Sequence, residues 1–135
     1  MNFNANQVLV TGAAGWLGSR LVRALSKGLP DYSQLGVPCS GLRIRCLILP
    51  GQDASALRNL GNQVEILEGD VRIPADCERF CSGAKDAILF HTAGIIHPRR
   101  IVEFQSINVL GCRNVLQAAS GAGIARAVVV SSNSP

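Results

Sequence analysis

The chain has 135 residues, of which 47% are hydrophobic and 16% are charged, and its formal net charge is +4. This length suits one domain, and the hydrophobic content excludes a disordered chain. The positive charge comes from scattered arginines without interleaved aromatic residues, so we expect no nucleic-acid partner. No apolar run approaches the roughly 20 residues that span a bilayer. The polar start MNFNANQ lacks the basic and apolar regions of a signal peptide, and we therefore expect a cytoplasmic protein with no membrane partner.

Short apolar runs alternate with longer amphipathic stretches, which is typical of βαβ units around a parallel sheet. The chain begins with a predicted buried strand at 7–12, a helix at 16–28 and a loop rich in proline, glycine and serine at 29–42. The alternation then continues with a strand at 43–51, a short helix at 53–61, a strand at 64–70, a helix at 74–84, a strand at 86–94, a long helix at 101–120 and a strand at 126–132. The predicted fold class is α/β: one Rossmann-type three-layer α/β/α domain over 1–135, with a parallel sheet of about five strands.

Three glycines lie in the segment VTGAAGWLG, between the first strand and the first helix. Gly12 lets the chain turn off the strand, Gly15 lets the backbone approach a pyrophosphate, and Gly18 lets the helix pack close to the sheet. The N–H groups at the helix start face the phosphates, aided by the positive end of the helix dipole. The pattern predicts a dinucleotide site, and its residues are Thr11, Gly12, Gly15, Trp16, Leu17 and Gly18.

The spacing G-x-x-G-x-x-G after a threonine resembles the extended short-chain dehydrogenase/reductase family, which comprises NAD(P)-dependent sugar epimerases, dehydratases and 3β-hydroxysteroid dehydrogenases. Four further segments resemble those of the family in the same order along the chain: GDVRIP, HTAGIIHP, INVLGCRNVLQAA and VVVSSNSP. The resemblance covers essentially the whole chain, which looks like the N-terminal portion of such an enzyme. It implies hydride transfer at a carbon that bears oxygen, in a nucleotide-sugar epimerase or dehydratase or a hydroxysteroid-type oxidoreductase.

The segments after the third and fourth strands carry further cofactor residues by this resemblance. In GDVRIP, it implies that Asp70 accepts a hydrogen bond from the adenine amino group and that Val71 is the backbone neighbour. In HTAGIIHP, it implies that the backbone at Ala93 and Gly94 lies against the ribose and the phosphates. We expect His91 to be a hydrogen-bonded residue at a strand end and not a catalytic base.

The last two segments carry the residues that the resemblance places near the reaction. Asparagine is unfavourable in a helix interior, so the two asparagines of INVLGCRNVLQAA require an explanation. The resemblance makes Asn108 a supporting residue that holds a helix distortion or a water, and it leaves open whether Asn114 is only an exposed polar position. In the family, a serine or threonine at the end of the fifth strand bonds the substrate oxygen. By spacing the predicted catalytic residue is Ser132, with Ser131 as the alternate.

The family's acid–base pair, Tyr-x-x-x-Lys, is absent from this sequence. The only tyrosine is Tyr32, followed four residues later by Gly36, and the only lysines are Lys27 and Lys85. In the family the pair follows the fifth strand. We therefore predict that residues 1–135 alone are inactive, as an incomplete NAD(P)-binding domain without the catalytic helix and the C-terminal substrate-binding region. The alternative is a non-catalytic NAD(P)-binding or sensing module.

The predicted fifth strand would form an apolar edge of the sheet, which is a hazard for aggregation. We therefore expect either self-association or a missing C-terminal part that covers this strand.

Cofactor selectivity depends on the end of the second strand, where a carboxylate binds the ribose 2′-hydroxyl of NAD and an arginine binds the 2′-phosphate of NADP. The segment LILPGQD places Leu49 there, with Asp53 a few residues later and Arg58 further on. The family often has an arginine in the place of Leu49. We therefore predict NAD as the cofactor and leave NADP open.

No metal site is predicted. Cys77 and Cys81 fit one helix face, but two ligands without a second pair are weak evidence, even with His91 and His97 nearby. The cysteines are odd in number and form no C-x-x-C pair, so we expect reduced, inert thiols.

Overall fold

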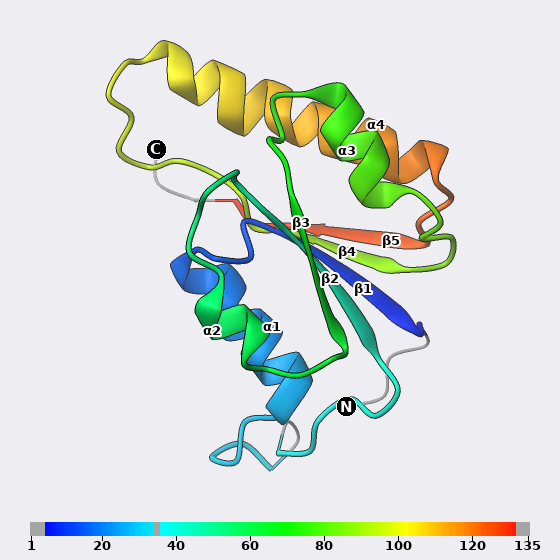
Figure 1. Cartoon of the computed structure of the whole chain (residues 1–135). Coiled ribbons are helices and arrows are strands. Elements are labelled where there is room, and N and C mark those ends of the chain that lie inside the picture. The colour runs from blue at the N-terminus through cyan, green and yellow to red at the C-terminus, as the bar shows by residue number, and fades with distance from the viewer. Residues whose placement is uncertain (1–4, 34–35, 132–135) are drawn as a thin grey trace.

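The computed structural model describes residues 5–33 and 36–131, and its centre is a sheet of parallel strands in the order β3-β2-β1-β4-β5 (Figure 1). The strands are β1 (Gln7–Thr11), β2 (Arg43–Ile48), β3 (Val64–Glu68), β4 (Ile88–His91) and β5 (Arg126–Val129). The helices are α1 (Trp16–Lys27), α2 (Ser55–Arg58), α3 (Pro74–Cys81), the π-helix η1 (Phe104–Gly111) and α4 (Cys112–Gly121). Within the described ranges, no helix combines the length and the apolar character needed to cross a membrane.

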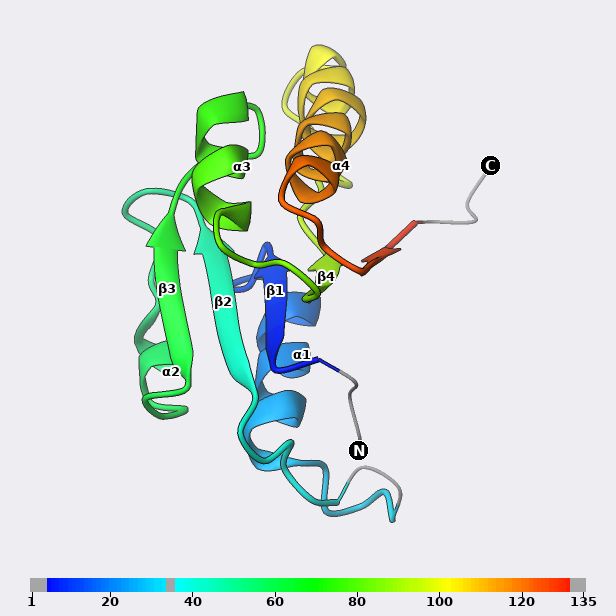
Figure 2. The ribbon, with the colours of Figure 1, turned by 90° about the vertical axis from the view of Figure 1, so that its right-hand side faces the viewer.

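The helices cover the two faces of the sheet separately, with α1 and α2 on one face and α3 and α4 on the other (Figure 2). Successive side chains of a strand point to opposite faces. Val8 and Val10 of β1 therefore pack with Val22 of α1, whereas Leu9 packs with Phe80 of α3. Every residue of β1 is buried, as expected for a central parallel strand covered on both faces. The predicted three-layer Rossmann-type fold is confirmed.

The strand order reverses at the centre of the sheet. β1 pairs with β2 on one side and with β4 on the other, so the second and third strands extend one way and the fourth and fifth extend the other way. The loops that follow β1 and β4 therefore leave the sheet in opposite directions. In open α/β sheets such a switch point leaves a crevice at the carboxyl ends of the strands, where ligands bind.

Several predicted elements are longer than the observed ones. The sequence predicts strands that end at 51, 70, 94 and 132, whereas β2, β3, β4 and β5 end at Ile48, Glu68, His91 and Val129. The helix predicted over 53–61 is reduced to the four residues of α2. After β2 and β4 apolar residues continue past the end of strand pairing, because Leu49, Ala93 and Ile95 line a cleft.

A long helix is present where the sequence predicts one over 101–120, but its first half is the π-helix η1 and only its second half is the α-helix α4. Within η1, the Asn108 side chain donates from Nδ2 to the Ile95 carbonyl and accepts the Ile95 N–H at Oδ1, both at 2.9 Å. Gly111 ends η1 against Val71, where an added Cβ would lie 2.8 Å from Val71 Cγ2. The widened turns thus bring this helix into contact with the loops after β4 and β3, and π-helical turns are frequent at functional sites.

β5 forms one edge of the sheet, and all four of its residues are exposed. The exposed fractions of Val128, Val129 and Val130 are 42%, 41% and 51%. An uncovered apolar edge strand favours association with another chain or segment. Self-association, or coverage by a C-terminal part, stays a prediction.

Candidate functional site

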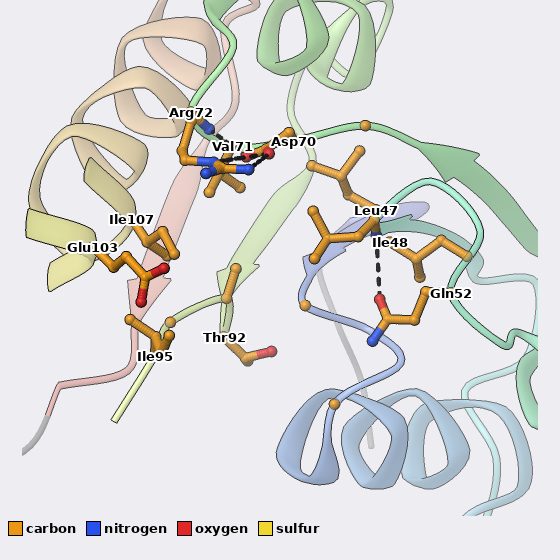
Figure 3. A pocket seen from close by; sticks show the side chains of 16 residues that line it. Leu47, Ile48, Gln52, Asp70, Val71, Arg72, Thr92, Ile95, Glu103 and Ile107 are labelled. Carbon is orange, nitrogen blue, oxygen red and sulfur yellow. Dashed lines mark hydrogen bonds and ion pairs between the residues drawn. The ribbon is translucent and has the colours of Figure 1, made fainter. Parts of the chain in front are cut away.

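A cleft of about 420 Å³ opens at the carboxyl ends of the strands, at the switch point between β1 and β4 (Figure 3). Its walls are the loops that follow β1, β2, β3 and β4, together with residues at the start of η1. The lining residues are Gly12, Gly15, Leu47, Ile48, Leu49, Gln52, Gly69, Asp70, Val71, Arg72, Thr92, Ala93, Gly94, Ile95, Glu103 and Ile107.

The structure brings most of the predicted cofactor residues together around this cleft. Those that line it are Gly12, Gly15, Leu49, Asp70, Val71, Ala93 and Gly94. Those that do not line it are Thr11 and Gly18, which are buried, and Trp16 and Leu17, whose side chains are exposed. A role of Trp16 and Leu17 at the cleft would therefore rest on their backbone N–H groups.

Two glycines of the first loop are required by close backbone contacts. Gly12 has φ +65°, and a Cβ added there would lie 2.7 Å from Cα of Ala93. A Cβ added at Gly18 would lie 2.3 Å from the carbonyl oxygen of Gly12. Side chains at either position would force these backbone segments apart, so the loop after β1 packs against both α1 and the loop after β4 only with glycine.

The backbone N–H groups at the start of α1 have no side-chain acceptor. Its N-cap is Gly15, with φ −72° and ψ 171°, no side chain caps the helix, and its first turn holds no acidic residue. The first N–H groups of a helix lack intrahelical acceptors, and they lie at the positive end of the helix dipole. This helix start is therefore suited to hold an anionic group such as a phosphate.

Asp70 is held on the wall of the cleft by Arg72, a residue that the sequence analysis missed. Arg72 Nε donates to both carboxylate oxygens, at 3.0 and 2.8 Å, and the Arg72 backbone N–H donates to Oδ1 at 2.9 Å (Figure 3). These bonds from Arg72 hold the pKa of Asp70 below its usual range. The available signal was the arginine two residues after the aspartate in GDVRIP. The cleft therefore has an ionised acceptor of fixed orientation.

Thr11 joins the ends of β1 and β4. Its Oγ1 lies 2.8 Å from Nδ1 of His91 and accepts the N–H of Ala93 at 3.2 Å, while Thr92 Oγ1 donates to the Thr11 carbonyl at 2.6 Å. Burial lowers the pKa of His91, which favours the neutral ring. A neutral ring that accepts the hydroxyl proton at Nδ1 carries its own proton on Nε2. The contacts are those of a strand-end residue that locks the two strands at the switch point.

The buried histidine makes stability depend on pH. Because the folded chain lowers the pKa of His91, the unfolded chain binds more protons below the ordinary histidine pKa of about 6.5. We expect the unfolding free energy to fall from about pH 7 to about pH 5, by at most about 1.4 kcal/mol per pH unit from this residue. Urea unfolding at stepped pH measures this slope. It should be smaller in His91→Gln than in the unchanged chain, whereas His97→Gln should leave it the same; equal slopes in both variants would contradict the assignment.

Two asparagines hold the loops that line the cleft. Asn108 bonds both backbone groups of Ile95 in the loop after β4. Asn114 is not the simple exposed position that the sequence left open, because its Nδ2 donates to the Val71 carbonyl at 3.0 Å. The helix formed by η1 and α4 thus supports two loops: the loop after β3, which holds the segment GDVRIP, and the loop after β4.

The predicted catalytic residues are only partly placed. Ser132 lies outside the described residues, and the alternate, Ser131, lies exposed two residues after the end of β5. α1 begins at the cleft and runs back toward the amino ends of the strands (Figure 1). Lys27 is its last residue and Tyr32 follows in the next loop, so both lie at the end of the sheet away from the cleft. Lys85 comes shortly before β4 and therefore also lies near the amino ends of the strands. The tyrosine and the lysines of this chain are therefore remote from the cleft.

The cysteines are free, and the two on α3 belong to the core. Burial raises the pKa of Cys77 to about 12 and that of Cys81 to about 11, and Cys77 Sγ donates to the Val71 carbonyl at 3.4 Å. Across residues 5–33 and 36–131, no group of three or more His, Cys, Asp or Glu is placed to hold a metal ion. The environment of both thiols is that of inert core residues.

The parallel strand order, the glycine turn at the switch point and the uncapped helix start together define a Rossmann-type dinucleotide-binding domain. A family model described as the NAD dependent epimerase/dehydratase family matches residues 8–135. The chain belongs to this family, and the predicted family resemblance is confirmed. NAD, the predicted cofactor, agrees with the family's description.

Three known proteins illustrate the relationship. The chain is 48% identical to the uncharacterized protein y4nL of Sinorhizobium fredii and 35% identical to a ceramide reductase of Caulobacter vibrioides, with 100% and 93% of this chain covered. It spans only 37% and 34% of the length of these relatives. The third is a uronate dehydrogenase variant from Agrobacterium tumefaciens, whose crystal structure contains NAD; its sequence is 25% identical to this chain and the TM-score is 0.68. The match covers 94% of this chain and 41% of the dehydrogenase chain.

Proposed function

We propose that this chain binds NAD in the cleft and forms the cofactor-binding part of an extended short-chain dehydrogenase/reductase. The observation that carries the proposal is the uncapped start of α1 beside glycines whose added Cβ atoms would collide with backbone. This arrangement presents N–H donors to a pyrophosphate and leaves room for close approach. The family match over residues 8–135 and the NAD in the related uronate dehydrogenase crystal support it.

The residues of the cleft fit the parts of the dinucleotide in order. The N–H groups at the start of α1 would hold the pyrophosphate, and the Asp70 carboxylate would accept a hydrogen bond from the adenine amino group. The backbone at Ala93 and Gly94 would lie against the ribose and phosphates, since a small side chain or none leaves that surface open. When bound, NAD would supply the hydride acceptor for oxidation of a carbon that bears oxygen.

Hydride transfer also requires that the substrate hydroxyl lose a proton. In the family a tyrosine with a neighbouring lysine removes this proton. Tyr32, Lys27 and Lys85 of this chain lie instead at the amino ends of the strands, away from the cleft. Without such an acid–base pair the reaction loses a factor of roughly 10² to 10⁴ in rate. We propose that residues 1–135 alone bind the cofactor without turnover. In a protein that also contains the tyrosine–lysine pair, Ser132 or Ser131 would contact the substrate oxygen.

A second candidate is a non-catalytic module that binds or senses NAD(P). In this candidate the cleft serves binding only. Both candidates are compatible with a cytoplasmic location, which we propose on the free state of the cysteines.

Calorimetric titration of the 135-residue chain with NAD tests the proposal. We expect saturable one-to-one binding, and weaker binding of nicotinamide mononucleotide because it lacks the adenosine half. With a nucleotide sugar or a hydroxysteroid added, we expect no formation of NADH. Absence of saturable NAD binding would refute the proposed function, whereas turnover by the chain would exclude the sensing module.

A further inference from the structure

The chain makes a tight turn directly after β2, at the edge of the cleft. Gln52 N–H donates to the Leu49 carbonyl at 3.1 Å, which closes a four-residue turn. Pro50 occupies its second position and Gly51, with φ +73°, its third. These residues and this positive φ are typical of a type II turn. The turn places Leu49 and Gln52 at the lining of the cleft.

The side chain of Gln52 is fixed by the same turn. Its Oε1 accepts the Leu49 N–H at 3.2 Å, so the amide carbonyl points back to the strand end. Figure 3 shows the nitrogen of this amide directed away from that bond, toward the start of α1. The group that Gln52 offers to the cleft is therefore a neutral N–H donor.

The neighbouring carboxylate does not take this place. Asp53 Oδ1 accepts the Ser55 N–H at 2.9 Å and Oδ2 accepts the Ser55 hydroxyl at 3.1 Å. These bonds direct the Asp53 carboxylate to the start of α2. Asp53 is not among the lining residues of the cleft, whereas Gln52 is. At the end of the second strand the cleft accordingly presents an apolar Leu49 and a neutral amide.

We infer that Gln52 sets cofactor selectivity in this cleft and that the chain accepts NADP as well as NAD. The adenosine ribose has to lie between the pyrophosphate at α1 and the adenine at Asp70, beside the end of β2. A carboxylate there binds a 2′-hydroxyl and repels a 2′-phosphate, whereas an amide N–H donates to an oxygen of either group. The inference rests on the proposed function, since it requires a dinucleotide in the cleft.

Titrations of the chain with NAD and with NADP, followed by calorimetry, test this inference. For the unchanged chain we expect dissociation constants within about tenfold of each other, a difference of at most about 1.4 kcal/mol. Gln52→Glu should weaken NADP binding by more than about tenfold relative to NAD, because it adds a negative charge beside the 2′-phosphate. Asp53→Asn is the matched control, and it should leave the ratio of the two constants unchanged.

The outcomes separate this inference from the proposed function. NAD binding with NADP more than about a hundredfold weaker, or a ratio that Gln52→Glu does not change, would overturn the inference and leave the proposed function standing. A ratio that changes in Asp53→Asn as much as in Gln52→Glu would assign selectivity elsewhere and overturn it as well. Absence of binding of both dinucleotides would overturn both proposals.

Discussion

Replacing Gly18 by alanine is expected to lower the unfolding free energy of the domain by roughly 3 kcal/mol or more, the upper range for overpacking. The added Cβ would lie 2.3 Å from the Gly12 carbonyl oxygen and 2.8 Å from Cα of Ala13. Both contacts are with backbone, which has no alternative rotamer to adopt. α1 would have to move away from the end of β1 and lose its packing on the sheet. Urea unfolding followed by circular dichroism measures the change.

Gly121→Ala provides a matched control for this substitution. Gly121 lies in α4, and a Cβ added there has no atom within 4 Å. Alanine is a better helix residue than glycine, so stability should stay the same or rise by up to about 1 kcal/mol. If Gly18→Ala unfolded at the urea concentration of the unchanged chain, the close packing of α1 on the loop after β1 would be wrong.

Replacing Gly15 by valine is expected to weaken NAD binding by roughly a hundredfold, about 2.7 kcal/mol, while the domain stays folded. The backbone at Gly15 has φ −72° and ψ 171°, which any residue adopts. The atom nearest to an added Cβ is the Gly12 carbonyl oxygen at 3.1 Å, and the remaining space is the cleft. A branched side chain there would occupy the position that we propose for the pyrophosphate. Calorimetry with NAD measures the loss.

Urea unfolding of Gly15→Val separates lost binding from lost structure. A variant that unfolds near the urea concentration of the unchanged chain yet binds NAD far more weakly supports the proposed position of the pyrophosphate. Undiminished NAD affinity in a folded Gly15→Val protein would place the dinucleotide elsewhere.

The fold was largely predictable because its signals are local. β1 is apolar throughout, α1 has apolar residues at helical spacing, and glycines separate the two, so element type and order follow from short segments. The ends of the strands were not predictable in the same way. The chain stays apolar past Ile48 and His91 because it continues along the cleft, and composition does not show where strand pairing stops.

The site was predictable where backbone geometry demands a residue type, as at Gly12 and Gly18. It was missed where a side chain acts through a partner that only the fold brings near. Asn114 is an example, because its partner is the Val71 carbonyl in the loop after β3. For Asn108 the resemblance implied a residue that holds a helix distortion, but neither its partner Ile95 nor the π-helix could be read from the sequence. Gln52 was missed because the selectivity rule names charged residues and Asp53 is the nearest one. Its carboxylate accepts bonds from Ser55 and does not line the cleft, whereas Gln52 does.

A two-dimensional ¹⁵N NMR titration of the chain with NAD shows which backbone amides contact the dinucleotide. We expect the backbone amides of Gly15, Trp16 and Leu17 to shift together and to saturate with the ligand, along with those near Asp70. Shifts confined to other surfaces, such as the groove between α3 and α4 lined by Glu78 and Gln117, would contradict it. The absence of any saturable shift would contradict it equally.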